Sequence, residues 1–168
     1  ATHKAHEVRF GPDQISSTQI RTAISSGDLE RAASMLGRPF SILGTVVHGD
    51  GRGKTIGFPT ANLDRHHELL PPHGVYGCRV DLDGRRIWGL TNVGVRPTFG
   101  GEAIESGEVH LLDHTGDLSG RDLELVFLKL LRGERKFASV DELKAQIGRD
   151  RIEFLAFLGD AVQPPPSA

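Results

Sequence analysis

Cysteine is almost missing from this sequence, since Cys78 is the only one among 168 residues. One thiol cannot form an intrachain disulfide, and it excludes a zinc site built from several cysteines. Long apolar runs are missing as well, because no segment approaches the roughly 18 apolar residues of a membrane-spanning helix. The first residues also lack the apolar core of a signal peptide. These absences favour a cytoplasmic protein with no membrane partner.

An excess of positive charge is lacking too, because 20 Lys and Arg residues face 22 Asp and Glu residues, which gives a net charge of −2. Aromatic residues make up 6% of the chain, with one Trp and one Tyr. A barrel that binds single-stranded nucleic acid needs a basic face with exposed aromatic rings. The sequence therefore predicts no nucleic-acid partner.

Glycine, by contrast, is abundant at 21 residues. Ser or Thr at positions 16–18 and Asp28 can cap two short helices near the front. Ser139 and Glu142 form a capping box for a C-terminal helix, with a break predicted at Gly148. Strand patterns lie between these helices, at residues 42–47, 74–82, 86–93, 108–112 and 121–131, with a hairpin signal at Asp83-Gly84 and loops at 48–59 and 94–101.

The strands follow one another through turns, without intervening helices. Five or six consecutive strands of this kind are typical of an antiparallel barrel or sandwich. They argue against a doubly wound sheet, and therefore against a Rossmann-type cofactor site.

The glycine-rich loop is the densest chemical signal. Gly49, Gly51 and Gly53 allow backbone N–H groups to turn toward an anion, and Lys54 adds positive charge. The P-loop motif is excluded, because His48 stands where that motif needs its first glycine. The alternative is an ordinary mobile hairpin loop.

Oxygen ligands follow the loop directly. Thr60 and Asn62 would point the same way in an extended segment, and their neutral oxygens suit Mg²⁺, although a turn is the alternative. Glu108 could act as a general base, or it could be a solvated charge on an edge strand. A zinc site at His110 and His114 is disfavoured, because a strand separates them.

A basic turn at residues 132–137 precedes the C-terminal helix. Arg132 and Arg135 offer planar guanidinium groups and Phe137 a flat ring, which together could clamp an anion or a planar ring. The alternative is a charged turn with Phe137 packed into the core. The histidines at 66, 67 and 73 are interpreted as surface residues.

Taken together, these segments resemble the riboflavin kinase family over about residues 38–158. The resemblance is carried by the glycine loop running into GFPTAN at 57–62, then VGVRPTFG at 93–100, EVHLLD at 108–113 and LRGERKF at 131–137. Four ordered motifs at plausible spacing are more specific than any one of them.

The resemblance implies a mainly β fold: a six-stranded antiparallel Greek-key barrel with short N-terminal helices and a C-terminal helix. It implies transfer of the γ-phosphoryl group of ATP, with Mg²⁺, to the ribityl 5′-hydroxyl of riboflavin, giving FMN and ADP. The alternative is a non-catalytic flavin-binding barrel, which would need neither the oxygen ligands nor the glutamate. The matches are Glu108 for the catalytic glutamate, Gly49, Gly51, Gly53, Lys54 and Thr60 for ATP, Thr60 and Asn62 for the metal, and Arg132, Arg135 and Phe137 for the flavin.

The front of the chain carries a second resemblance. Residues 15–21, ISSTQIR, look like the last motif of the adenylyltransferase module in bacterial bifunctional FAD synthetases. This implies a remnant of that module with linker helices at 1–37, the kinase barrel and its helix at 38–160, and a disordered tail at 161–168. The missing module would be the natural partner. The intact parent would also make FAD from FMN and ATP, whereas this chain should not.

Overall fold

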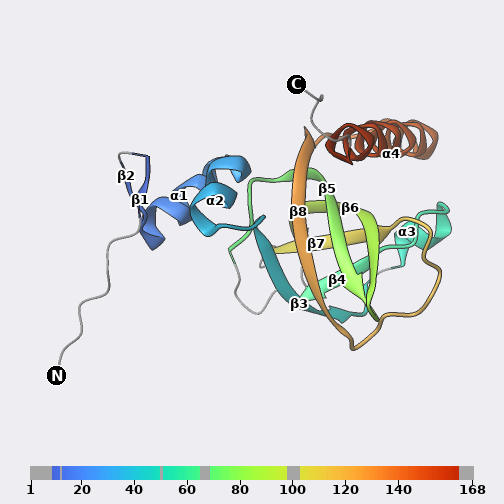
Figure 1. The fold of residues 1–168 in the computed structure, drawn as a ribbon. Helices are drawn as coiled ribbons and strands as arrows, with labels where there is room; N and C mark the ends of the chain where they lie inside the picture. Colours follow the sequence, from blue (N-terminus) through green and yellow to red (C-terminus); the bar gives the residue numbers. More distant parts are fainter. Residues whose placement is uncertain (1–8, 12, 50, 65–68, 98–102, 163–168) are drawn as a thin grey trace.

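The computed structural model describes residues 9–11, 13–49, 51–64, 69–97 and 103–162. Its centre is a closed barrel of six antiparallel strands in the order β3-β4-β7-β6-β5-β8 (Figure 1). This confirms the predicted fold class. The strands are β3 (Ser41–Val47), β4 (Ala61–Asp64), β5 (Gly74–Leu82), β6 (Arg85–Pro97), β7 (Ala103–Leu111) and β8 (Asp122–Gly133).

The β5–β6 hairpin turns at the predicted Asp83-Gly84 pair. Asp83 has φ 51° and Gly84 has φ 75°. A two-residue type I′ turn requires positive φ at both positions, and its twist matches that of the flanking strands. Strand β5 covers the predicted range.

Two loop predictions are wrong within the described residues. Residues 94–97 were expected in a loop, but they continue β6 and pair with the start of β7, which begins at Ala103 instead of 108. Gly94 and Pro97 favour a loop locally, yet the ladder tolerates both, because Pro97 lies at the strand end. The rest of that loop, 98–101, lies outside the described residues. The glycine-rich loop also contains a one-turn helix, α3 (Arg52–Thr55), preceded by Gly51 at φ 67°.

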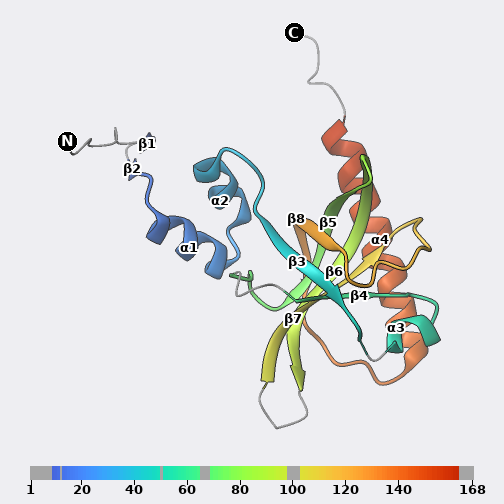
Figure 2. The same cartoon turned by 90° about the horizontal axis from the view of Figure 1, so that it is seen from below.

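Two capped helices precede the barrel and lie to one side of it, α1 (Ser17–Ser26) and α2 (Leu29–Leu36) (Figure 2). The side chains of Ser16 and Asp28 each accept a hydrogen bond from the backbone N–H three residues on, so both predicted caps are confirmed. Buried apolar residues of both helices belong to the same core cluster as the barrel interior. The two short strands before them are β1 (Arg9–Phe10) and β2 (Asp13–Gln14).

The C-terminal helix α4 (Val140–Val162) runs unbroken through Gly148, so the predicted break is wrong. A helical glycine keeps its backbone N–H, and its cost of about 1 kcal/mol is small beside the packing of a buried helix face. The capping box is confirmed in part. Ser139 Oγ accepts from the N–H of Glu142, whose carboxylate accepts from Ala138 N instead of Ser139 N.

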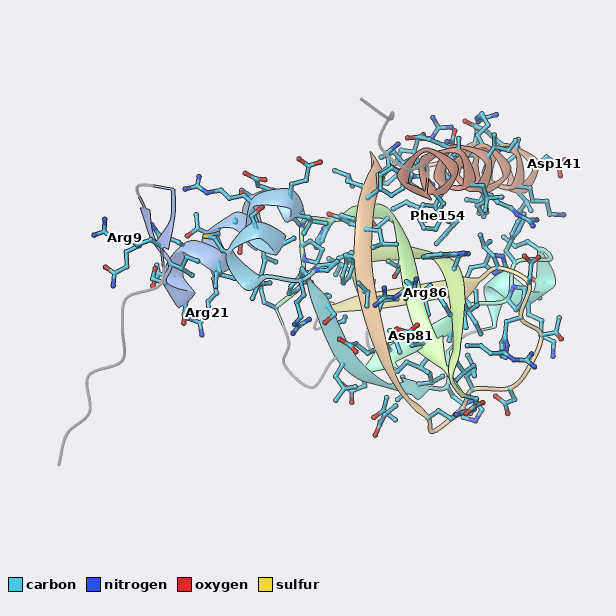
Figure 3. The ribbon with its side chains drawn as sticks, viewed as in Figure 1. Arg9, Arg21, Asp81, Arg86, Asp141 and Phe154 are labelled. Atoms are coloured by element: carbon cyan, nitrogen blue, oxygen red, sulfur yellow. The ribbon has the colours of Figure 1, made fainter. Side chains whose placement is uncertain are left out.

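Helix α4 lies along the barrel and is held there by Phe154, whose side chain is fully buried (Figure 3). The ring rests on β5 at Gly77, where a Cβ would lie only 2.7 Å from Phe154 Cγ. Trp88 and Phe157 pack against the same ring, each with its ring centroid 6.3 Å away. Docking of α4 therefore requires a glycine at position 77.

Two titratable side chains lie inside the barrel. The Tyr76 hydroxyl donates to the backbone oxygen of Pro72 (2.6 Å), and burial raises the pKa of Tyr76 to about 12. Burial also raises the pKa of the Cys78 thiol, which keeps it protonated and unsuited to nucleophilic chemistry. None of the described helices is long and apolar enough to span a membrane.

Candidate functional site

Glu108 stands at the centre of the candidate site, on the outer face of β7. Its neighbours Gly107 and Val109 are buried toward the barrel interior, whereas Glu108 is half-buried. Directly opposite it are Asn62 on β4 and Asn92 on β6. Directly opposite residues share one sheet face. The register thus flanks one carboxylate with two carboxamides.

The glycine-rich loop lies over the β4 side of this row. A Cβ at Gly49 would overlap the carboxamide nitrogen of Asn62 and lie 2.6 Å from its Cγ. A Cβ at Gly53 would lie 3.1 Å from Thr60 Oγ1. Thr60 and Asn62 therefore both face the loop, which is the common direction expected of an extended segment. Only glycine at positions 49 and 53 leaves room for the loop to lie so close to them.

The segment that leads from the glycine-rich loop into β4 is held by His110. This residue lies on the same face as Glu108, two residues further along β7. His110 Nδ1 donates to the backbone oxygen of Pro59 (2.8 Å), and its ring meets Phe58 edge-on at 5.4 Å between centroids. Among the residues that the structure describes, no three His, Cys, Asp or Glu side chains gather closely enough to hold a metal ion. His110 thus has a clear structural task in positioning the Thr60 segment.

On the β6 side of Glu108 lie three residues to which the sequence gave no role of their own. The buried Thr91 hydroxyl donates to the backbone oxygen of Glu108 (3.2 Å). Asn92 is exposed beside Glu108, and its Nδ2 would lie 3.3 Å from a Cβ at Gly94. The Glu134 carboxylate lies over the same glycine, so residues 132–137 begin next to Asn92.

The basic turn forms a stack around one ring. The guanidinium carbon of Arg135 lies 4.6 Å from the centroid of Phe137, and that of Arg132 lies 5.4 Å from it. Arg132 also pairs with Asp150 of α4, whose side chain is 3% exposed. Phe137 is half-buried, so the ring is partly available at the surface.

Comparison with known proteins decides the family. The family model "Flavokinase: Riboflavin kinase" matches residues 36–158. The chain belongs to the riboflavin kinase family.

Relatives with curated names agree. The bifunctional riboflavin kinase/FMN adenylyltransferase of Escherichia coli K12 is 47% identical over 150 residues, which cover 89% of this chain and 48% of that protein. The protein of the same name from Bacillus subtilis is 41% identical over 150 residues, covering 88% of this chain and 48% of the relative. The chain thus spans about half the length of these relatives.

A solved structure, named as a macrolide-efflux protein from Streptococcus pneumoniae, is also similar. It is 38% identical with a TM-score of 0.76, over 86% of this chain and 48% of that one.

Within this riboflavin kinase domain, the predicted site residues fall into two groups on either side of Glu108. Gly49, Gly53, Thr60 and Asn62 are brought together at β4. Gly51 precedes α3 and Lys54 lies in it, exposed. The second group consists of the residues predicted to bind the flavin. Both guanidinium groups lie against one phenyl ring there, at Arg132, Arg135 and Phe137.

The residues that the sequence reading missed depend on tertiary pairing. Asn92 was assigned to a strand without a role, because nothing local reveals that β6 pairs with β7 in this register. Asp150 did leave a signal. It lies three residues after Ile147 and four before Phe154, so a helical face that packs on the barrel contains one carboxylate.

Proposed function

We propose that this chain transfers the γ-phosphoryl group of ATP to the ribityl 5′-hydroxyl of riboflavin, giving FMN and ADP. The observation that carries this proposal is the register of Asn62, Glu108 and Asn92 across β4, β7 and β6. It sets one carboxylate between a glycine loop suited to phosphates and a turn suited to a planar ring. That is the arrangement a phosphoryl transfer to a flavin alcohol needs.

Glu108 is the proposed catalytic residue. The 5′-oxygen attacks the γ-phosphorus, the bond from that phosphorus to the β,γ-bridging oxygen breaks, and ADP leaves with that electron pair. The hydroxyl proton passes to a carboxylate oxygen of Glu108. Because the transition state is loose, this proton can leave late, so the main contribution of Glu108 is to hold and orient the alcohol.

The glycine loop is the proposed ATP site. Backbone N–H groups at Gly49, Gly51 and Gly53, together with the Lys54 ammonium, would bind the phosphates. Mg²⁺ arrives with ATP as part of the substrate. Thr60 and Asn62 fit it as ligands, because Mg²⁺ takes few protein oxygens and completes its shell with phosphate and water.

The turn at residues 132–137 is the proposed flavin site. Guanidinium planes and a phenyl ring suit a planar heteroaromatic ring. Asn92, exposed between this turn and Glu108, is a further candidate for hydrogen bonds to the ribityl hydroxyls. Its carboxamide can donate and accept, as a polyol requires.

For the rest of the chain, we propose that residues 1–37 are a remnant of an adenylyltransferase module with linker helices, and that residues 38–160 form the kinase unit. The relatives named for both activities are about twice as long as this chain, which supports this division. The activity is proposed to be cytoplasmic, with an adenylyltransferase module of the kind for which the relatives are named as its natural partner. FAD formation is not expected from this chain.

The test is incubation with riboflavin, ATP and Mg²⁺, followed by chromatographic separation of the flavins. FMN without FAD is the expected product. Glu108→Ala should lower turnover by about 10²–10⁴-fold, the usual contribution of a general base, and leave riboflavin binding largely intact. Glu124→Ala, on the exposed face of β8, is the matched control and should keep full activity.

Three outcomes would count against the proposal. A normal kcat in Glu108→Ala would remove this residue from catalysis. Riboflavin binding without binding of Mg·ATP would favour a flavin-binding barrel without catalysis. FAD in the product would mean that an adenylyl-transfer site is present in this chain.

A further inference from the structure

A buried carboxylate lies beneath the proposed flavin site. Asp150 in α4 is 3% exposed, and both of its oxygens accept from Arg132 Nε, at 3.1 and 3.0 Å. Gln146, one turn earlier, donates its Nε2 to the same carboxylate at 2.7 Å. Arg132 also donates Nη1 to the backbone oxygen of Gly133 (3.3 Å). Its guanidinium plane is therefore oriented from two directions.

A second ion pair lies about two turns before Asp150, near the start of α4. Glu142 accepts from Arg135 Nη2 (3.4 Å) and from the backbone N–H of Ala138 (3.0 Å). Residues 142, 146 and 150 are spaced four apart, so they form one stripe on the helix. This stripe holds both arginines of the turn, and Phe137 lies against both guanidinium groups.

The two ties differ in strength. The Arg135–Glu142 pair is exposed, at 44% for each side chain, and exposed pairs contribute little. The Arg132–Asp150 pair is 18% and 3% exposed, so loss of one partner leaves the other desolvated and unpaired. Helix α4 is itself fixed to the barrel by Phe154, four residues beyond Asp150, on Gly77. Asp150 thus links a rigid helix to the first arginine of the turn.

We propose that Asp150 is a positioning residue for riboflavin, which acts through Arg132 by holding its guanidinium plane in the orientation that receives the flavin ring. The inference rests on the proposed function. It adds a residue outside every motif of the family resemblance. It also gives α4 a task in substrate binding beyond covering the barrel.

The test is steady-state kinetics of the Asp150→Asn variant, with riboflavin and Mg·ATP varied in turn. We expect the KM for riboflavin to rise about tenfold, which corresponds to about 1.4 kcal/mol of binding free energy. The kcat and the KM for ATP should stay within about twofold, because Glu108 and the glycine loop are not touched. A purely structural role would lower the active fraction and the melting temperature without this split between KM and kcat.

The matched control is Glu153→Gln on the same helix. Glu153 pairs with Lys129 at 3.0 Å, but its side chain is 50% exposed, so all three kinetic constants should remain unchanged. A double-mutant cycle then tests the route. In an Arg132→Met background, Asp150→Asn should raise the riboflavin KM no further, because the residue through which it acts is gone.

If Asp150→Asn does not fold, Gln146→Met gives the same test in milder form, because it removes one donor to the carboxylate and keeps the charge. A riboflavin KM raised several-fold at unchanged kcat supports the inference, and an unchanged KM overturns it.

The remaining outcomes separate this inference from the proposed function. An unchanged riboflavin KM in Asp150→Asn, when Arg132→Met raises it, overturns the inference alone. An unchanged KM in Arg132→Met removes Arg132 from the flavin site and overturns the inference with that assignment. If the chain without any substitution forms no FMN, the proposed kinase activity itself is refuted.

Discussion

Replacing Gly77 with alanine would place a methyl group against the ring of Phe154. The Cβ would overlap two ring-edge carbons and lie 2.7 Å from Cγ, so rotation of the ring about its axis cannot relieve the contact. Phe154 is fully buried, with Trp88 and Phe157 packed on it, and cannot move aside freely. Either the ring or the whole of α4 must therefore shift.

The sign of the effect is informative, because two terms oppose each other. In a strand interior, alanine is normally favoured over glycine by about 0.5–1 kcal/mol. Overpacking a well-filled core costs about 1–3 kcal/mol. Because the Cβ overlaps a fully buried ring, the overpacking cost should lie in the upper half of that range, at about 2–3 kcal/mol. We therefore expect Gly77→Ala to lower the free energy of unfolding by about 1–2.5 kcal/mol.

Urea unfolding followed by fluorescence measures this change, because Trp88 is the only tryptophan and lies against Phe154. Gly107→Ala in β7 is the matched control. No heavy atom of the described residues lies within 4 Å of its Cβ position, so this variant should be neutral or slightly stabilising. In a Phe154→Leu background, the cost of Gly77→Ala should shrink, because the smaller side chain leaves room. A Gly77→Ala variant as stable as the parent would refute the close packing of α4 on β5.

Two further predictions concern metal binding and alkaline pH. Asn62→Ala should raise several-fold the Mg²⁺ concentration needed for half-maximal activity, since it removes one proposed oxygen ligand; an unchanged Mg²⁺ titration would remove Asn62 from that role. Tyr76 is the only tyrosine, so the ultraviolet absorbance of tyrosinate reports it alone. Its ionisation should have a midpoint near pH 12 in the folded protein, where burial raises the pKa of Tyr76, and near pH 10 in denaturant. Burial favours the neutral phenol, so this contribution to stability is complete below pH 10 and is lost as the pH rises toward 12. A folded-state midpoint near 10 would contradict the buried position of this hydroxyl.

Features determined by neighbouring residues could be predicted from the sequence. The caps at Ser16 and Asp28 and the Asp83-Gly84 turn are local, because a side chain or a positive φ acts on the backbone within a few residues. The range of β5 was also predicted at both ends, and the Asp83-Gly84 turn sets its last residue. In each case local preference and tertiary structure favour the same conformation.

The misses occur where tertiary contacts override local preference. Gly94 and Pro97 favour a loop, but pairing with β7 extends β6 through them. Gly148 favours a helix break, but Ile147 and Phe154 hold the helix against the barrel on both sides of it. The short helix α3 ends where backbone N–H groups donate to the oxygens of Gly53 and Lys54. It has no capping side chain at its start, so the sequence offers no local signal for it.

The site shows the same division between local and non-local information. A family resemblance identifies Glu108, Asn62 and Arg132 as separate candidates, but their relation depends on the strand order. Strand β7 lies between β4 and β6, although the β5–β6 hairpin separates β4 from β7 in the chain. That crossover sets Asn62 and Asn92 on either side of Glu108. The end of β8, which pairs with the start of β5, brings Glu134 over β6. Asn92 and Asp150 therefore emerge as candidates only after the barrel closes and α4 docks, and their variants are the ones that test the structure beyond the family motifs.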